Sequence, residues 1–453
     1  MRKSIENLIV VGIVISIMNS SIIPVFAVET TPTANPKTLK SAQTDTNGGG
    51  NISIGQGIQN TANKKILKLN DAINAAINNS DKFSLKSKEI KYYRDKEDLQ
   101  EKTTDFNKSL STDNYSDDVY DYPYDKLELQ EKQTEQSRDF MEDQITSDIT
   151  NKYNDMVLKQ IDIDKSKRNL ELKKNDLFFL KGKLSLGMAV DNQVTDADVE
   201  LKSLQNDITA KENALSDAKD YFKVLTDFDL KNTYILDYDM DYTKFKIDGS
   251  VDDYIDDKLN SYFEYDDKIL DLTKDYLKDL KDDGIKENVD KDAVTTSVPT
   301  QSDSKYLTKD AAGNVDFNYG QFACDSLSYA KDQLKYYNAL NSYGAYLDGR
   351  YSYNESKVKL DDTKKNLKNI LKQNYSTLLD IENKIDNLKE QVNSTNTKLR
   401  FAKAQVDMGL MLQNDYDKQV VASQDLDTGL RKLVYIHNNL RDSIEKPWIL
   451  SNQ

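Results

Sequence analysis

The side chains that most often perform catalysis or bind metals are almost absent from this chain. It holds one histidine, His437, and one cysteine, Cys324, so it can form neither an internal disulfide nor a metal site built from several such residues. Acid–base chemistry would fall to the 77 Asp and Glu residues, and no carboxylate pair stands out among them by its spacing. We therefore predict no enzymatic activity, no cofactor and no metal site.

The charge balance and the composition narrow the class of protein further. The chain carries 62 Lys and Arg against 77 Asp and Glu, a net charge of −15, whereas a nucleic-acid partner requires a basic surface. Of its 453 residues, 31% are charged, 38% are hydrophobic, 16 are Gly and 6 are Pro. A chain this polar with so few helix breakers can bury narrow stripes on long helices but not several thick cores. We expect an all-α fold and no nucleic-acid partner.

The N-terminus has the three parts of a secretory signal. Arg2 and Lys3 precede an apolar run at 8–17, and small residues up to Ala27 suit a cleavage site, so we predict a signal peptide at 1–27. The alternative is a buried hydrophobic helix. The Thr-, Pro-, Asn- and Gly-rich segment 28–61 is predicted to be a disordered leader. No other stretch approaches 18 apolar residues, so we expect no membrane-spanning helix.

The rest of the chain is duplicated. From Ile149 onward an apolar residue recurs every seven residues, and the same ladder returns 222 residues later with all positions apolar. A heptad repeat sustained over this length is typical of coiled coils. The twelve ladder residues are Ile149, Met156, Ile163, Leu170, Leu177 and Leu184, then Leu371, Leu378, Ile385, Val392, Leu399 and Val406.

Each copy is predicted to be a long antiparallel helical hairpin. A second ladder follows Gly187 in the first copy and Gly409 in the second, so the chain should fold back at each glycine. The ascending helix of the first copy should run from about Lys126 to Leu186. Shorter helices are expected at about 66–110 and 252–281. We divide the chain into a first repeat at 62–230, a linker at 231–251, a second repeat at 252–446 with an insertion at 282–353, and a tail at 447–453.

Two segments between helices carry weak strand signals. Tyr120, Tyr122 and Tyr124 alternate, as do Val315, Phe317 and Tyr319 in the insertion, where Asp348-Gly349 could turn a short hairpin. The first segment has room for neither two membrane-spanning strands nor their turn, and the second lacks an apolar band of the right height. We expect at most short β-strands in the insertions.

Two single residues have simple interpretations. His437 takes the place of Leu215 on the second ladder and lies between Leu433 and Leu440, which favours a core or interface imidazole over a ligand or a pH sensor. Cys324 lies near Phe322 and has no cysteine partner, which favours a buried free thiol.

Three motifs resemble those of the TolC family, the outer membrane efflux protein family. The stretch LKLNDAINAAINN at 67–79 is similar to the opening motif of the family. The stretches at 184–194 and 406–416 resemble the tips of its two hairpins. The resemblance covers about 66–444 and implies a divergent member of the family, with little or no transmembrane barrel because the strand insertions are short or too polar.

The resemblance implies a function and partners. Family members are passive ducts in which three copies form a hollow helical tube, and the tips meet a periplasmic adaptor, or membrane fusion protein, that links the duct to an inner-membrane pump. Carried over to this chain, the docking surface would be Leu186, Gly187, Met188, Met408, Gly409 and Leu410.

The resemblance also implies a gate, which would be partial here. The family narrows its inner mouth with aspartates six residues after each tip glycine, a place held by Asp415 in the second half and by Gln193 in the first. A further acid of the family, three residues on, is Lys418 here. An aspartate at a helix start also suits the helix dipole without any gate.

These observations leave two functions open. The first is an exported efflux or secretion duct in the cell envelope, placed in the outer membrane if the host has one and otherwise in the cell wall or outside the cell. The second is a secreted coiled-coil spacer or adhesin of the envelope with no transport role. Both use the same helices, so the helix pattern alone does not separate them, and contact with a membrane stays open.

Overall fold

The fold is described from a computed structural model, in which residues 64–110, 115–290, 297–309 and 312–452 are described. The predicted signal peptide and leader lie outside these ranges. The described residues form two compact units, unit 1 from 86–137 and 263–366, and unit 2 from 64–85, 138–262 and 367–452. Within the described ranges, no helix combines the length and the apolar character needed to cross a membrane.

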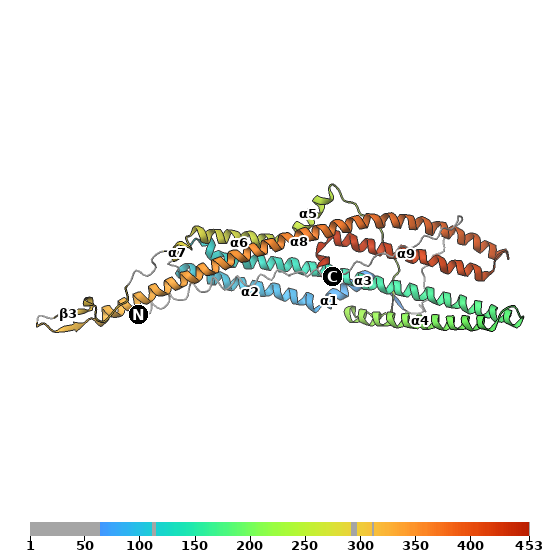
Figure 1. The fold of residues 1–453 in the computed structure, drawn as a ribbon, viewed down its shortest axis with the longest axis horizontal. Helices are drawn as coiled ribbons and strands as arrows, with labels where there is room; N and C mark the ends of the chain where they lie inside the picture. The colour runs from blue at the N-terminus through green and yellow to red at the C-terminus, as the bar shows by residue number, and fades with distance from the viewer. Residues whose placement is uncertain (1–63, 111–114, 291–296, 310–311, 453) are drawn as a thin grey trace. The chain divides into compact units, whose positions relative to one another are not determined.

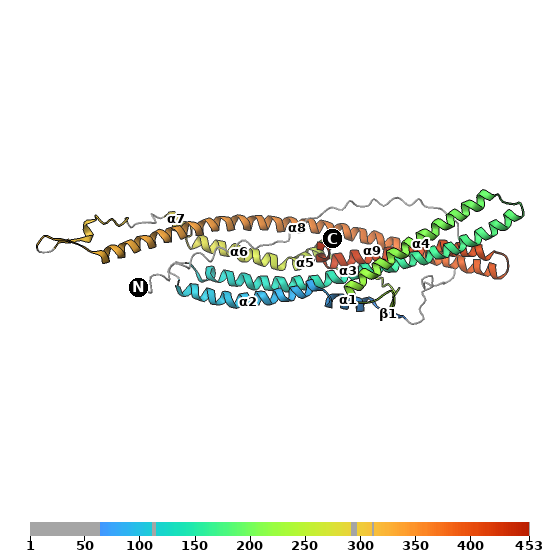
Figure 2. The same ribbon diagram turned by 90° about the horizontal axis from the view of Figure 1, so that it is seen from below.

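Unit 1 is a row of four helices. They are α2 (Asp81–Leu110), the first part of α3 (Asp117–Ser185), α6 (Glu264–Asp282) and the first part of α8 (Tyr319–Asp407). Figure 2 shows α2 beside α3 and α6 beside α8. Between α6 and α8 the chain forms α7 (Glu287–Asp290), the short 3₁₀ turn η2 (Ser304–Tyr306), and an antiparallel strand pair, β3 (Leu307–Lys309) and β4 (Val315–Phe317).

Polar and aromatic contacts join each helix of unit 1 to the next one in the row. They run from α2 to α3 through Arg94 and Glu135 (2.8 Å), from α3 to α6 through the stacked rings of Tyr122 and Tyr276 (3.9 Å), and from α6 to α8 through Asp267 and Lys364 (2.6 Å).

Unit 2 contains both hairpins and is also a row of four helices. The order in the row is α4 (Asp191–Thr226), the second part of α3, α9 (Gln413–Glu445) and the second part of α8. Figure 1 shows α4 beside α3 and α9 beside α8. The unit also holds β1 (Lys65–Leu67), α1 (Leu69–Asn78), β2 (Tyr234–Leu236), α5 (Val251–Tyr262) and the C-terminal 3₁₀ turn η3 (Pro447–Asn452).

Contacts again join neighbours in the row of unit 2. They run from α4 to α3 through Glu200 and Lys173 (2.7 Å), from α3 to α9 through Asn151 and Tyr435 (2.7 Å), and from α9 to α8 through Ser443 and Asn374 (3.1 Å).

The heptad ladders form the seams of these hairpins. Nine of the twelve ladder residues are buried, and Leu184, Val392 and Val406 are half-buried. The ladder residues therefore form part of a narrow apolar seam between helices that are otherwise largely polar. The predicted class, long antiparallel helical hairpins in two repeats with only short strands, is confirmed.

The opening motif closes the base of the first hairpin. Leu67, Ala72 and Ala76 are buried in a core cluster with Phe222 of α4. The Tyr153 hydroxyl donates to the Leu67 carbonyl at 2.6 Å and accepts the N–H of residue 237, also at 2.6 Å. β1 and β2 pair in parallel beside it, outside the insertions where we expected strands, because this tyrosine holds both segments against α3.

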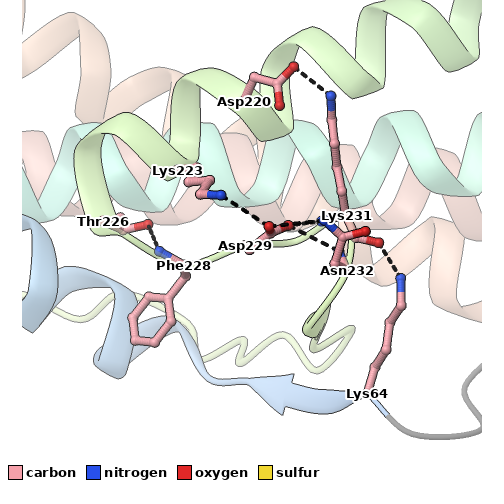
Figure 3. Close-up of polar contacts among 8 residues, drawn as sticks. All are labelled: Lys64, Asp220, Lys223, Thr226, Phe228, Asp229, Lys231 and Asn232. Atoms are coloured by element: carbon pink, nitrogen blue, oxygen red, sulfur yellow. Dashed lines mark hydrogen bonds and ion pairs between the residues drawn. The ribbon is translucent and has the colours of Figure 1, made fainter.

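A polar turn directs the chain from α4 into β2. The Asp229 carboxylate accepts the backbone N–H groups of Lys231 (2.9 Å) and Asn232 (3.0 Å), and Lys223 pairs with it at 3.0 Å, as Figure 3 shows. These bonds, first of all the backbone bond from Asn232, lower the pKa of Asp229 below its usual range. The Asp229 carboxylate therefore accepts hydrogen bonds from backbone N–H groups that lie beyond the end of α4 and have no helical carbonyl to bind.

Beyond β2 the linker crosses the second hairpin as an extended strap, residues 237–245. Arg431 donates to the carbonyl of residue 238 at 2.7 Å, and Asn438 donates to the carbonyl of residue 241 at 3.0 Å. Lys244 pairs with Asp386 of α8 at 2.6 Å. Side chains of α9 thus provide hydrogen bonds to the carbonyl groups of the strap, which belongs to no sheet, and an ion pair with α8 holds its Lys244.

The strap ends on a buried ionisable pair. His437 is fully buried, and its Nε2 lies 3.0 Å from Oε1 of the buried Glu382, which also accepts the N–H of Phe245 at 2.7 Å. The ring of Tyr242 contacts the imidazole edge-on, with centroids 4.9 Å apart. The predicted core role of His437 is confirmed. In the first repeat the two positions hold Leu215 and Gln160.

Two local expectations are wrong, and one weak strand signal does not lead to a strand. Asp348-Gly349 lies inside α8 and turns no hairpin, and the Tyr120–Tyr124 segment lies inside α3. The tyrosines are helical because Tyr122 and Tyr346 are buried in one core cluster among α3, α6 and α8, which outweighs their local alternation. The predicted buried position of Cys324 is wrong, because this thiol is exposed.

We expect the buried pair to be replaceable only as a pair. His437→Leu should lower the free energy of unfolding by about 3 kcal/mol, because it leaves the Glu382 carboxylate buried with one partner fewer. Adding Glu382→Gln reproduces the pairing of the first repeat and should recover most of the loss. Urea unfolding of the single and double variants measures this; equal losses in both would contradict it.

The stability of unit 1 should increase as the pH falls from about 7 to 4. Burial, and then Asp267 nearby, raise the pKa of Asp266 to about 6, so the folded chain binds a proton that the unfolded chain, with its ordinary value of about 4, does not. Asp266→Asn should weaken this dependence and stabilise the protein at pH 8. Unfolding curves at pH 5 and pH 8 test it, with the exposed Asp271→Asn as a control that should leave the dependence unchanged.

Candidate docking surface at the hairpin tips

The first hairpin turn is built by a double hydrogen bond at the end of α3. The Gly187 N–H donates to the Leu184 carbonyl at 2.9 Å, and the Met188 N–H donates to the Lys183 carbonyl at 2.8 Å. This pair of bonds is the Schellman motif, which satisfies carbonyls that the last helical turn leaves free. The motif requires a left-handed backbone conformation at Gly187. The first helix therefore ends at a fixed place.

The second turn repeats the first, with each residue number raised by 222. The Gly409 N–H donates to the Val406 carbonyl at 2.9 Å, and the Leu410 N–H donates to the Gln405 carbonyl at 2.8 Å. Gly187 has a φ of +71° and Gly409 a φ of +74°. The internal repeat thus includes the backbone bonds of the turns as well as the heptad pattern.

Backbone angle is the reason for glycine at both turns. A Cβ added to either residue would meet no atom within 4 Å, so no neighbour in the chain requires the absence of a side chain. Only glycine adopts a positive φ at low cost. The predicted turn role of Gly187 and Gly409 is confirmed, whereas a partner's approach to them stays a prediction.

Six large apolar side chains are exposed around the two turns. Each has between 61% and 74% of its surface exposed, whereas the ladder residues Leu177 and Leu399 earlier in the same helices are buried. Exposed apolar groups that gather in one place are typical of interaction sites. We call these residues the tip surface: Leu186, Met188 and Val190, with Met408, Leu410 and Leu412.

Sequence reasoning found four of these six residues and missed Val190 and Leu412. Both are N-caps, which directly precede α4 and α9, a position where Ser, Thr, Asp or Asn would be usual. The signal that could have identified them is that both are apolar and lie 222 residues apart. An apolar residue at the same unfavourable place in both copies indicates a requirement other than helix capping.

The apolar surface continues one heptad along each first helix. Phe179 in α3 and Phe401 in α8 lie seven residues before Leu186 and Met408, and they are 55% and 64% exposed. Residues seven apart share one face of a helix. An aromatic ring therefore extends the tip surface on each hairpin.

The residues predicted to form a gate lie in the first turns of the second helices. Gln193 is exposed, and its Oε1 accepts the N–H of Val190 at 3.2 Å, so this side chain caps α4. Asp415 is exposed in the first turn of α9, near the positive end of the helix dipole. Neither the capping bond nor the dipole position requires a gating role.

A polar link joins the two hairpins beside Asp415. Asp176 of α3 accepts from Asn414 at 2.8 Å and pairs with Lys418 at 2.9 Å. Burial acts to raise the pKa of Asp176, but the bonds from Lys418 and Asn414 outweigh it and the net pKa is lowered. Lys418 occupies the position where the family resemblance implies an acid. Its positive charge is neutralised because it pairs with Asp176 of the first hairpin.

The described parts of the chain contain no group of three or more His, Cys, Asp or Glu side chains placed to hold a metal ion. The tip surface instead offers apolar area on two rigid helical turns. Such an arrangement can bind a protein surface, and it contains no acid–base pair or nucleophile for a reaction.

Comparison with known proteins shows the fold of this chain. No protein-family model and no curated protein matches it. A membrane protein from Pseudomonas aeruginosa is 10% identical, with 90% of this chain and 98% of that chain covered and a TM-score of 0.52. The CmeC outer membrane channel of Campylobacter jejuni is 12% identical (91% and 93% covered, TM-score 0.50), and the outer-membrane channel OprN is 9% identical (90% and 99%, 0.50). The fold expected from the TolC resemblance is confirmed.

Alanine at either turn glycine should destabilise the protein. Gly187→Ala and Gly409→Ala should each lower the free energy of unfolding by about 1–2 kcal/mol. A positive φ is strained for alanine, and the added methyl group disturbs no neighbour. Gly182, inside α3 and equally free of neighbours, is the matched control, and Gly182→Ala should stabilise by about 0.5–1 kcal/mol. Urea unfolding compares the three; a loss at Gly182 as large as at the turns would contradict the assignment.

Proposed function

We propose that the protein is a passive, exported duct for efflux or secretion, which assembles from several copies into a helical tube. It docks an adaptor protein through the tip surface and takes its transport energy from a pump in the inner membrane. The observation that carries this proposal is the tip surface itself. Two turns with the same hydrogen bonds expose three apolar side chains each, at positions related by the repeat.

The tip surface supports docking because it contradicts the pattern of the hairpins. Along the hairpins most ladder residues are buried, whereas all six residues of the tip surface are exposed. Exposed Leu, Met and Val gain free energy only when a partner covers them. The expected partner is an adaptor of the membrane fusion type that presents a complementary apolar surface to two adjacent tips.

The arrangement of helices supports a tube. In each unit the contacts run along a row from the first helix to the fourth, which suits lateral association of further copies, whereas a closed bundle would leave no open edge. CmeC and OprN, which share the fold, are outer membrane channels. By analogy we propose a homotrimer in the cell envelope, reached through the predicted signal peptide and located in the outer membrane if the host has one.

A gate at the tips would be weakly acidic. Only Asp415 contributes a carboxylate at the expected place, because Gln193 is neutral and Lys418 is paired with Asp176. We propose that Asp415 lines the inner mouth once in each copy. The chain itself performs no reaction in this proposal.

The proposal is tested by cross-linking the tips in cells. In a Cys324→Ser background, Met188→Cys and Leu410→Cys should each form adducts with an envelope adaptor, identified by mass spectrometry, because a docked adaptor covers both tips. Val224→Cys on α4, which is as exposed as Leu410, is the matched control and should give no adaptor adduct. If neither tip captures an adaptor, docking is wrong and the spacer or adhesin function is favoured.

A further inference from the structure

The contact between α2 and α3 in unit 1 depends mainly on polar side chains. The two helices lie side by side (Figure 2), yet Ile90 is the only apolar side chain that is buried among those described in α2. The hydroxyl of the buried Thr104 donates to the Tyr120 carbonyl at 3.4 Å, and Lys108 pairs with Asp121 at 2.8 Å. With so little apolar area in the contact, its polar groups decide how firmly α2 is held.

In the middle of this contact two carboxyl groups meet. The side chain of Glu97 in α2 lies at hydrogen-bonding distance from Glu131 in α3, which has 13% of its side chain exposed. The Oε1 atom of Glu97 is buried, and no donor in the described part of the chain binds it. Two ionised carboxylates are both acceptors and repel each other, so the two groups can bond only when one of them carries a proton.

Arg94 binds the other carboxylate of the pair. It lies one turn before Glu97 in α2 and forms ion pairs with Glu131 and, at 2.8 Å, with Glu135 of α3. Its charge also acts on Glu97, but the effect is smaller than that of Glu131. Because a guanidinium pairs with an ionised carboxylate, we place the shared proton on Glu97.

The other groups around the pair add negative charge without a free cation. Glu128 of α3 also acts on Glu97, and the nearby Lys132 is bound to Glu128 at 2.5 Å. Further ionisable groups of α2, α3 and α6 lie close to these residues: Glu101, Tyr124, Glu264, Tyr265 and Lys268.

These surroundings make the contact sensitive to pH. Burial, and then the charge and the hydrogen bond of Glu131, raise the pKa of Glu97 to about 7 from its usual value of 4.5. Between these two values α2 carries a proton on Glu97 when it is packed against α3, and none when it is apart. The packed arrangement is therefore favoured at low pH and is weakened as the pH rises through 7.

We propose that Glu97 and Glu131 form a pH-sensitive latch, which holds α2 against α3 while they share a proton and loosens the helix when that proton is lost to water. Loss of the proton removes the hydrogen bond and leaves two negative charges in contact. Few buried apolar groups oppose the separation of α2, so one such bond is a large part of what holds this segment. The latch lies within one copy and does not rest on the proposed duct.

Hydrogen exchange of the mature chain tests the latch. After correction for the intrinsic pH dependence of exchange, backbone amides at 90–108 should lose protection by about tenfold between pH 5 and pH 8, since each unit of pKa difference shifts the equilibrium tenfold. A wild-type α2 with the same protection at both pH values would overturn the latch, and this measurement needs no variant.

Two variants should fix the latch in its closed form. Glu97→Gln should keep α2 protected at pH 8, because its amide donates to Glu131 at every pH. Glu131→Gln should act in the same way, since its amide can donate to the Glu97 carboxylate. The matched control is Glu101→Gln, one turn further along α2 at an exposed position, which should leave the tenfold change as in the wild type. A tenfold change that persists in both latch variants would overturn the proposal.

Asp266→Asn separates the latch from the other carboxyl group of unit 1 that takes up a proton near neutral pH. This substitution in α6 should leave the pH dependence of α2 unchanged. If it removes that dependence while Glu97→Gln retains it, the pH response belongs to Asp266 and the latch is wrong.

Discussion

The structure depends on narrow apolar seams, which repeat every seven residues along helices whose surfaces are otherwise largely polar. A stripe of this width covers the contact between two helices but not a compact core. Each helix therefore needs a neighbour on the side where its stripe lies, and the chain supplies these neighbours in rows of four. The inner helices of a row are covered on both sides, whereas the outer ones are covered on one side only.

Duplication applies this constraint twice within one chain, and the differences between the copies are informative. Most equivalent positions keep their apolar character, so both hairpins close in the same way. The pair His437 and Glu382 replaces Leu215 and Gln160 where the strap crosses the second hairpin. A buried ionisable pair adds little net stability over apolar packing, but here Glu382 also holds the backbone of Phe245 and so fixes the path of the strap.

The two turns show the opposite balance between burial and exposure. The two Schellman bonds at each turn lie within the chain itself, so the turns form without a partner. Their side chains are apolar and exposed in both copies, which costs solubility in the isolated chain. A rigid turn with an uncovered apolar surface is suited to docking, and the chain carries such a turn on both hairpins.

The sequence by itself determined the hairpins, their turns and the repeat, because heptad spacing and a glycine with positive φ are local properties that a helix expresses wherever it lies. The core position of His437 followed in the same way. Only the tertiary structure decided which apolar residues stay uncovered: in α2, Ile90 is buried, whereas Tyr92, two residues further on, is exposed. It also decided that Tyr122 and Tyr346 are helical and that Cys324 is exposed. These outcomes depend on which neighbour covers each helix face, and the residues that form one face do not contain that information.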